Sequence, residues 1–279
     1  DKTYNKIAIM TGAGISVAAG IPDFRTPGTG LYAKVGELGL PYPEAIFSLE
    51  FLRDDPLPFF KIANGFLTYK AKPVKAHNFI KRVSDKGQLL VNFTQNIDGL
   101  ELDAGVPEGL LIQAHGHMRS AHCVECGIEA PISEFFAHVS REEVFYCPRC
   151  GDSPDTDANR GVIKPDIIFF GEQLPLSFRN KMTHIAQADL VIVMGTSLKV
   201  YPFAALLSMV SHGVPIVLLN REDVGCINTD QHPFVFVQGD IEESVTRLAE
   251  DLEWVLDDAG ACTTGTTGTA GVSGEKAPP

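Results

Sequence analysis

The chain has 279 residues, and its content of 44% apolar and 21% charged residues is typical of a folded globular protein and excludes wholesale disorder. Its net charge of −12 provides no basic surface of the kind that nucleic-acid-binding proteins use, so we expect no direct nucleic-acid partner. No apolar run approaches the roughly 18 residues that cross a bilayer, so we expect no membrane partner.

Seven short aliphatic runs predict buried β-strands. Each run is apolar almost throughout rather than at alternate positions, which is typical of parallel strands covered on both faces. Helix-like segments lie between several of them, and this alternation indicates an α/β fold with a Rossmann-like, doubly wound parallel sheet. The predicted strands are residues 6–11, 89–94, 110–114, 166–170, 189–194, 215–219 and 234–237.

Two of the connecting helices have recognisable ends. One is predicted over residues 202–212, with Pro202 in its first turn and Gly213 just past its end. The other begins at Asp240, a good N-cap residue with Glu243 three positions later. Its predicted apolar stripe consists of Ile241, Val245, Leu248, Leu252 and Val255.

Four of the six cysteines form two C-x-x-C pairs, separated by twenty residues. Two such turns together place four thiolates around a zinc ion, and four sulfur ligands leave no position for water, so the predicted zinc is structural. The pattern also favours a reducing, intracellular compartment over a disulfide framework, without saying which compartment. The predicted ligands are Cys123, Cys126, Cys147 and Cys150.

Two stretches interrupt the strand–helix alternation and predict a smaller helical and zinc-binding module. The first has many aromatic residues and prolines but no clear strand, and the second contains the cysteine pairs. The last 22 residues are mostly Gly, Thr, Ala and Pro, which predicts a disordered tail. The module comprises residues 28–75 and 119–160, the Rossmann-like domain 1–27, 76–118 and 161–257, and the tail 258–279.

A glycine-rich turn, Gly12 to Ser16 (GAGIS), follows the first predicted strand. Small residues here let the backbone approach a pyrophosphate, which also benefits from the N-terminus of the following helix. Position 17 is Val, so the third glycine of the dinucleotide fingerprint is missing and a turn without a ligand remains an alternative. Arg25 in the following loop is placed to neutralise an anionic ligand.

Polar side chains follow several other predicted strands, at the edge where open α/β sheets bind ligands. Residues 95–98 (QNID) suit a ribose and a carboxamide, or alternatively an Asx-type turn. His115 comes directly after the next strand, where an imidazole can act as a general base, although lone histidines are more often structural. Later strands are followed by Gly195, Thr196, Ser197, Asn220 and Arg221.

In this order the motifs resemble those of the sirtuins, the NAD-dependent protein lysine deacylases. The resemblance covers residues 6–257 and rests on GAGIS, GIPDFR, TQNID, HG, the two C-x-x-C pairs, KPDIIFFGE, GTSL and NR. The sequences PDFRTPGTGLY, LPYPEAIF and FFGE are similar to the deacetylase branch. The resemblance implies that the acetyl group of acetyl-lysine in peptides or proteins is transferred to ADP-ribose from NAD, with release of nicotinamide.

The resemblance also implies roles for individual residues. His115 would be the general base, with Asn96 and Asp98 also catalytic. The substrate peptide would add as a strand between edges formed by Phe170, Gly171, Glu172 and Val200. The chain departs from the family at His117, where a small hydroxyl residue is more usual. Implied NAD contacts are Gly12, Ala13, Gly14, Phe24, Arg25, Gln95, Asn96, Ile97, Asp98, Gly195, Thr196, Ser197, Asn220, Arg221, Asp240 and Ile241.

Three other functions remain as alternatives. The same NAD site suits mono-ADP-ribosyl transfer onto protein, which a nicotinamide-release assay with and without acetyl-lysine would distinguish. A non-catalytic interaction module held together by zinc is disfavoured by the presence of His115, Asn96 and Asp98. A hydride-transferring dehydrogenase is disfavoured by the incomplete glycine turn and by the lack of a second catalytic domain.

Overall fold

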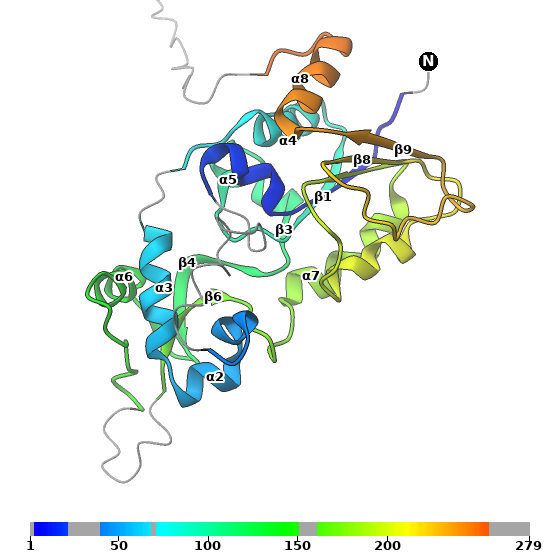
Figure 1. Cartoon of the computed structure of the whole chain (residues 1–279). Helices are drawn as coiled ribbons and strands as arrows, with labels where there is room; N and C mark the ends of the chain where they lie inside the picture. Colours follow the sequence, from blue (N-terminus) through cyan, green and yellow to red (C-terminus); the bar gives the residue numbers. More distant parts are fainter. Residues whose placement is uncertain (1–2, 22–39, 68–70, 151–160, 257–279) are drawn as a thin grey trace, which may run out of the picture.

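A computed structural model describes residues 3–21, 40–67, 71–150 and 161–256. Within these residues the chain forms a six-stranded sheet in the order β3-β2-β1-β7-β8-β9 and a three-stranded sheet in the order β5-β4-β6. Figure 1 shows the large sheet with its helices as one unit, with the small module beside it. The predicted α/β fold, with a Rossmann-like sheet and a smaller module, is confirmed.

All six strands of the large sheet run parallel. The chain builds outward from β1 in one direction through β2 and β3, and then returns to the other side of β1 with β7. Open parallel sheets bind ligands at such a switch point, beside the carboxyl ends of the strands. The strands are β1 (Ile7–Thr11), β2 (Leu89–Thr94), β3 (Leu111–Gln113), β7 (Leu190–Met194), β8 (Ile216–Asn220) and β9 (Phe234–Gln238).

The carboxyl ends of the three central strands are level with one another. Thr11 at the end of β1 pairs in register with Thr94 of β2 and with Met194 of β7. The residues that follow these strands therefore lie side by side at one edge of the sheet. This places the polar residues predicted after the strands close to one another.

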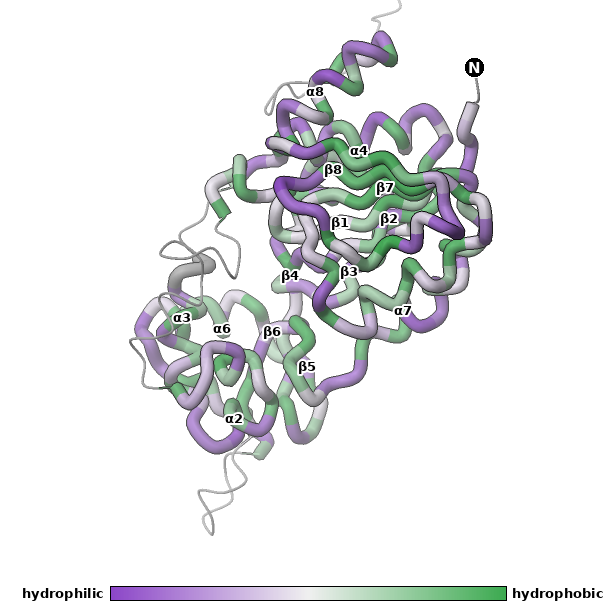
Figure 2. Tube along the Cα trace, turned by 45° about the vertical axis from the view of Figure 1, so that its right-hand side comes forward, coloured by the Kyte–Doolittle hydropathy of each residue, from purple (hydrophilic) through white to green (hydrophobic). Residues whose placement is uncertain are grey.

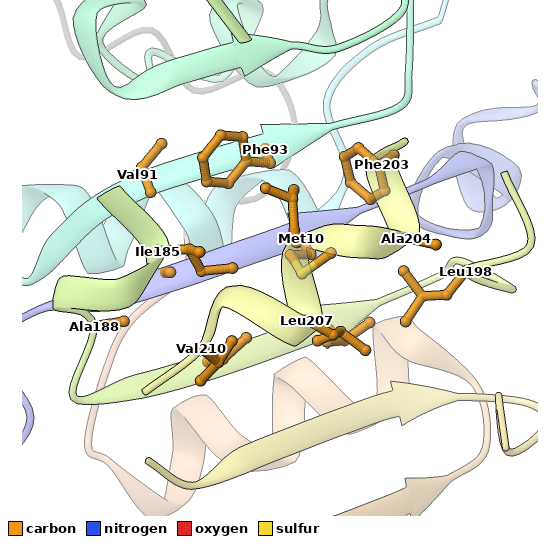
Figure 3. Close-up of a cluster of buried hydrophobic side chains, with 14 of the residues drawn as sticks. Met10, Val91, Phe93, Ile185, Ala188, Leu198, Phe203, Ala204, Leu207 and Val210 are labelled. Atoms are coloured by element: carbon orange, nitrogen blue, oxygen red, sulfur yellow. The ribbon is translucent and has the colours of Figure 1, made fainter. Parts of the chain in front are cut away.

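Helices cover both faces of the large sheet. Successive residues of a strand point to opposite faces, so each strand contributes side chains to both helical layers. Ile7 and Ile9 pack against one helical layer, and Ala8 and Met10 pack against the other. Figure 3 shows the second layer, where Phe203 lies beside Met10. The first layer contains η1 (Ala13–Ala19), α4 (Lys75–Asp85), α5 (Leu100–Asp103) and α8 (Ile241–Asp251). The second contains α7 (Leu176–Lys181), η6 (Met182–Gln187) and η7 (Phe203–Met209), and η4 (Glu108–Leu110) precedes β3.

Helix α4 illustrates how the sequence produces these layers. Its buried residues Ala76, Phe79, Ile80 and Val83 are three or four positions apart and so form one stripe. Burying each large apolar side chain contributes about 1.5–3 kcal/mol. In Figure 2 the strands of the large sheet form a hydrophobic layer inside more hydrophilic surroundings.

The small module has a core of aromatic rings. Phe59 lies edge to face against Phe169, with ring centroids 5.1 Å apart, and also contacts Phe60, Phe47 and Phe135. Edge-to-face pairs at this separation are worth about 0.5–1.5 kcal/mol beyond their burial. The module contains η3 (Pro43–Phe47), α2 (Leu49–Asp54), α3 (Leu57–Leu67), β4 (Gly116–Cys123), β5 (Glu129–Ala130), α6 (Ile132–Ser140) and β6 (Ile163–Ile167).

One predicted strand was assigned to the wrong sheet. Residues 166–170 were expected to be a buried parallel strand, but only Asp166 and Ile167 belong to a strand, β6, which lies antiparallel to β4 in the small sheet. Only one face of this segment is fully buried: Ile167 and Phe169 lie in the module core, whereas Phe170 is 51% exposed. The continuous apolar run therefore concealed an alternating pattern, which is typical of antiparallel strands.

Both helices with predicted ends form, but each is shorter than expected. The helix predicted over residues 202–212 is the 3-10 helix η7, which ends at Met209 because Val210 is extended. Helix α8 begins as predicted, with the Asp240 carboxylate accepting the backbone N–H groups of Glu242 and Glu243. It ends at Asp251, so Leu252 and Val255 lie outside it and are 44% and 73% exposed.

None of the helices in the described ranges is long and apolar enough to cross a membrane. The predicted tail of residues 258–279 lies outside the described residues, and its disorder stays a prediction. The predicted domain boundaries also stay predictions, although β6 itself belongs to the small sheet.

Candidate active site

The glycine turn after β1 lies against the turn after β7. The Gly14 N–H donates to the carbonyl oxygen of Gly195 at 2.9 Å. A Cβ on Gly14 would lie 2.6 Å from the Cα of Gly195, and Gly195 has a φ of +63°, which favours glycine. These glycines thus allow two backbone turns to meet at the switch point of the sheet, where a dinucleotide binds in this fold class.

Gln95 connects the ends of three strands. Its backbone N–H donates to Thr11 O of β1 at 3.0 Å, and its side-chain Oε1 accepts the Thr196 hydroxyl at 2.5 Å. The Asn220 side chain, at the end of β8, donates to Thr196 O at 3.2 Å. Predicted polar residues at the ends of β2, β7 and β8 are therefore brought into one hydrogen-bonded group, which also includes the backbone at the end of β1.

Asn96 and Asp98 meet at Ser16 of the glycine turn. The Ser16 hydroxyl donates to Asp98 Oδ2 at 2.7 Å, and the Asn96 side-chain amide donates to Ser16 Oγ at 3.3 Å and to Gly12 O at 3.2 Å. Asp98 Oδ1 accepts the Leu100 N–H at 3.0 Å. Burial raises the pKa of Asp98, although these two hydrogen bonds oppose the rise.

His77 on α4 contacts the Ser16 hydroxyl. Its Nδ1 accepts the Val74 N–H at 3.2 Å, so its proton is on Nε2, which lies 3.4 Å from Ser16 Oγ. Ser16 Oγ therefore accepts from His77 and Asn96 and donates its own proton to Asp98. Burial lowers the pKa of His77 to about 4, so the ring is neutral at pH 7.

Sequence reasoning assigned no role to His77 or Ser16. Ser16 is the last residue of the glycine-rich turn, and the sequence does not show where its hydroxyl points. His77 is a single polar residue on the buried face of an amphipathic helix, and nothing in the sequence distinguishes it from a structural histidine. Glu101, a fully buried acid on α5, was also missed.

His115 lies next to the QNID segment, oriented by a single hydrogen bond. Its Nδ1 lies 3.1 Å from the carbonyl oxygen of Gln95, which can only accept, so Nδ1 carries the proton and Nε2 keeps its lone pair. Burial lowers the pKa of His115 below its ordinary value of 6.5, against the opposing effect of the Gln95 carbonyl. A neutral imidazole with a free Nε2 is the state that a general base requires.

The residues implied for the adenosine half of NAD lie at the ends of β7, β8 and β9. Thr196 is buried and Ser197 is exposed. Arg221 pairs with Asp240 at 3.6 Å, and Asp240 also caps α8. Ile241 is buried in the core beneath that cap.

Ala13 and Ile97 lie on the two loops of the site. Ala13 is half-buried in the glycine turn. Ile97 is half-buried as well and packs against the core of the small module, so the QNID segment contacts both units. Phe24 and Arg25, implied as further NAD contacts, lie outside the described residues.

The four residues implied for substrate binding have different surroundings. Phe170 pairs through its backbone with Phe47 and Leu49, while its ring is 51% exposed. The Glu172 carboxylate stabilises the following turn, because it accepts the Phe169 N–H at 2.7 Å and pairs with the buried Lys164 at 3.0 Å. Gly171 is exposed and Val200 is half-buried.

The four cysteines of the small module form a cluster that fits zinc. Their sulfur atoms all lie within 4.8 Å of one another, with Cys123 and Cys150 at 3.9 Å and Cys126 and Cys147 at 3.7 Å. Four sulfurs at about 2.3 Å from a tetrahedral zinc are about 3.8 Å apart. The N–H groups of Glu125 and Cys126 also point at the Cys123 sulfur. The donor set and its spacing therefore suit a structural zinc ion.

His117, the departure from the family pattern, is the second residue of β4 and lies two positions after His115. It lines a cavity of about 470 Å³ together with Gln113, Arg119 and Asp166. Burial lowers its pKa, with Arg119 adding to the effect.

Comparisons with known proteins agree with this geometry. A model of the Sir2 family matches residues 12–202. The NAD-dependent protein deacetylase hst2-1 of Emericella nidulans is 45% identical over 254 residues, which cover 91% of this chain and 68% of that protein. The NAD-dependent protein deacetylase sirtuin-3 of Mus musculus is 42% identical over 254 residues, which cover 91% and 73%. The NAD-dependent protein deacetylase sirtuin-2 of Danio rerio is 46% identical over 222 residues, which cover 78% and 56%. The matched segment contains the glycine turn, the QNID segment, His115 and all four cysteines, and the chain belongs to the Sir2 family, the sirtuins.

Proposed function

We propose that the chain is an NAD-dependent protein deacetylase that acts on acetylated lysine side chains. The observation that carries this proposal is the hydrogen-bonded group of Ser16, Asn96 and Asp98 at the switch point of the sheet, with His115 bonded to the carbonyl of the residue before Asn96. NAD supplies a nicotinamide leaving group and an ADP-ribose that accepts the acetyl group. The donor set fits it, since hydroxyl, amide and carboxylate groups of the kind that bind ribose and a carboxamide lie beside two glycine turns that pack closely together.

His115 acts as the general base in this proposal. Its Nε2 accepts a proton from a ribose hydroxyl, while its Nδ1–H donates to Gln95 O and holds the ring in one orientation. Protonation then places a positive charge in a buried site, which the Gln95 carbonyl partly stabilises. A positioned general base contributes about 10²–10⁴-fold to a rate.

Asp98 and Asn96 hold the nicotinamide side of the site. The Ser16 hydroxyl and the Leu100 N–H fix the Asp98 carboxylate, and Asn96 is fixed against Gly12 O and Ser16. These partners restrict both side chains to one orientation before a ligand enters, which lowers the entropic cost of binding. Asp98 then accepts from the carboxamide of the nicotinamide.

The acetylated peptide adds as a strand beside Gly171 and Val200. The N–H and C=O of Phe170 already pair with Phe47 and Leu49, so its exposed ring provides the contact instead. Recognition of this kind reads the peptide backbone more than its side chains, which suits an enzyme that acts on many sequences. The net charge of −12 favours peptides that carry positive charge.

A peptide assay tests the proposal directly. The protein is incubated with an acetyl-lysine peptide, with and without NAD, and the peptide mass and free nicotinamide are measured. We expect loss of one acetyl group and release of nicotinamide only when both NAD and the acetylated peptide are present. His115→Ala should lower turnover by about 10²–10⁴-fold while its circular dichroism spectrum is unchanged. Nicotinamide release without acetyl-lysine, with ADP-ribose added to protein, would support mono-ADP-ribosyl transfer instead, and deacetylation without NAD would contradict the proposal.

A further inference from the structure

The carboxyl group of Glu101 lies beside the proposed nicotinamide pocket, and none of the roles above uses it. Glu101 is the second residue of α5 and is 0% exposed. Helix α5 begins two residues after Asp98, and its first N–H, that of Leu100, donates to Asp98 Oδ1. Burying a charged carboxylate is costly unless it is paired or fully hydrogen-bonded, so a second acid here requires an explanation.

The hydrogen-bond partners of Glu101 are hydroxyl groups at the ends of two central strands. Its Oε1 lies 3.4 Å from the hydroxyl of Thr11, the last residue of β1. The hydroxyl of Thr94, the last residue of β2, also bonds to Glu101 and accepts the Asn96 N–H at 3.1 Å. The glycine turn begins after Thr11 and the QNID segment begins after Thr94. Glu101 therefore connects the starting points of both loops of the site.

The bonds from the Thr94 and Thr11 hydroxyls favour the charged form of Glu101, but they do not fully satisfy it. The Thr11 hydroxyl also lies 3.5 Å from Phe93 O and from Asn92 Oδ1, which can only accept. One hydroxyl proton can serve only one acceptor, so the Thr11 hydroxyl cannot satisfy a charged Glu101 together with these two oxygens. Glu101 Oε2 is buried and has no hydrogen-bond partner among the described residues, which costs a charged group more than a neutral one.

Asp98 is the group that opposes ionisation of Glu101. Burial, and then repulsion from Asp98, raise the pKa of Glu101 to about 7. The strands β1 and β2 present neutral groups to it, namely Thr11, Thr94 and Asn92. The titratable or charged groups on the other neighbouring elements of the described chain are Asp98, Asp103 of α5, and His77, Lys75, Lys81, Arg82 and Asp85 of α4.

We propose that Glu101 is a positioning residue of the NAD site, which in its protonated form braces the glycine turn against the QNID segment and leaves Asp98 without a second negative charge beside it. This inference rests on the proposed function, because it takes Asp98 as the nicotinamide contact. Loss of the proton would place two buried negative charges, on Glu101 and Asp98, close together in one short segment, where they repel each other. Asp98 would then be displaced from Ser16 and Leu100, and NAD would no longer be held correctly.

The pH dependence of kcat/KM for NAD tests the proposal. In the wild type we expect a fall of about tenfold between pH 6.5 and pH 8, because Glu101 loses its proton over this range. Glu101→Gln keeps a neutral side chain of the same shape at every pH, so it should match the wild type at pH 6.5 and keep its activity at pH 8. Glu101→Leu lacks the hydrogen bonds and should be impaired at both values. The acid side of the profile, set by His115, should be the same for the wild type and Glu101→Gln.

Thermal stability provides a readout that does not depend on activity. The folded state holds a proton on Glu101 up to pH about 7, whereas the unfolded chain releases it near the ordinary value of 4.5. The wild type therefore loses stability through Glu101 as the pH rises from 4.5 to 7, and Glu101→Gln does not. The Tm of Glu101→Gln relative to the wild type should rise over this range and then stay constant. Glu250→Gln, an exposed change on α8, should show no such trend.

The outcomes separate this proposal from the proposed function. A Glu101→Gln enzyme with the wild-type alkaline fall, or one that is inactive or unfolded at pH 6.5, would overturn the role of Glu101. A wild type without NAD-dependent deacetylation would overturn the proposed function instead. In that case the trend in Tm still decides whether Glu101 is protonated in the folded protein.

Discussion

His77, a buried and neutral histidine, makes the stability of the fold depend on pH. His77 is 0% exposed and its neutral ring is used at both nitrogens, by the Val74 N–H and by Ser16 Oγ. Protonation would convert Nδ1 from an acceptor into a donor, which would face the Val74 N–H, and would place a charge in the core. At low pH, protonation of His77 should therefore lower the free energy of unfolding. It should also disturb the Ser16 hydroxyl that donates to Asp98.

We predict that His77→Leu reduces the pH dependence of unfolding. The pKa of His77 is about 4 when folded and 6.5 in its ordinary state, so its contribution is present above pH 6.5 and is lost as the pH falls towards 4. Between pH 7 and pH 5 the wild type should lose about 2 kcal/mol more than His77→Leu. Urea unfolding at both pH values measures the difference.

His212→Leu serves as the control for this experiment, because His212 is exposed. It should keep the wild-type pH dependence. Equal losses for the wild type and His77→Leu would mean that His77 is not held neutral in the folded protein. NAD-dependent turnover of His77→Leu should also fall at pH 7, since Ser16 loses one of the partners that orient it.

At the scale of single elements, close backbone approach makes the glycine turn sensitive to a single methyl group. A Cβ on Gly14 would lie 2.6 Å from the Cα of Gly195 and 2.9 Å from its carbonyl oxygen, and both are backbone atoms that cannot move away cheaply. Gly14→Ala should therefore push the turns after β1 and β7 apart and disrupt the Gly14 N–H to Gly195 O bond.

We predict that Gly14→Ala lowers NAD affinity by at least about tenfold and lowers Tm by several degrees, since overpacking costs about 1–3 kcal/mol. Calorimetric titration with NAD and a thermal melt measure the two effects. The matched control is Gly109→Ala, because a Cβ at Gly109 meets nothing within 4 Å. Gly109→Ala should behave as the wild type, and normal NAD binding by Gly14→Ala would contradict close contact of the turns.

The elements show how far the sequence alone can be interpreted. The ends of β1 and β2 were predicted correctly at Thr11 and Thr94, because a polar or glycine-rich segment follows each apolar run directly. Residues 166–170 were assigned to the wrong sheet, because four apolar residues in a row carry no information about which face is buried.

The same limit applies to the site. The QNID segment, His115 and the four cysteines could be proposed from the sequence because their spacing and their position after strands are local properties. Ser16, His77 and Glu101 act through partners 61 to 90 residues away in the chain. Such pairings are set by tertiary packing, so the sequence shows them only as isolated polar residues.

On the scale of the whole molecule, a single strand connects the cysteine cluster to His115, the proposed general base. β4 begins at Gly116, next to His115, and ends at Cys123, one of the four cysteines. Its partner β6 leads into Phe169, whose ring packs in the core of the small module, and then into the Phe170 turn proposed for substrate binding. Loss of the metal should therefore affect the active site even though the zinc performs no chemistry there.

We predict that zinc removal abolishes activity by unfolding the small module while the large sheet persists. The cluster brings four thiols within 4.8 Å, and without a metal to bind them the module loses a contribution of about 10 kcal/mol or more. Cys147→Ser should bind less than one zinc per chain and lose NAD-dependent turnover, whereas Cys226→Ser, an exposed cysteine outside the cluster, should retain both. Metal content by mass spectrometry, together with protease sensitivity of residues 40–67 and 116–150, measures the effect. Full activity in a zinc-free protein would show that the module folds without the metal and that β4 does not depend on it.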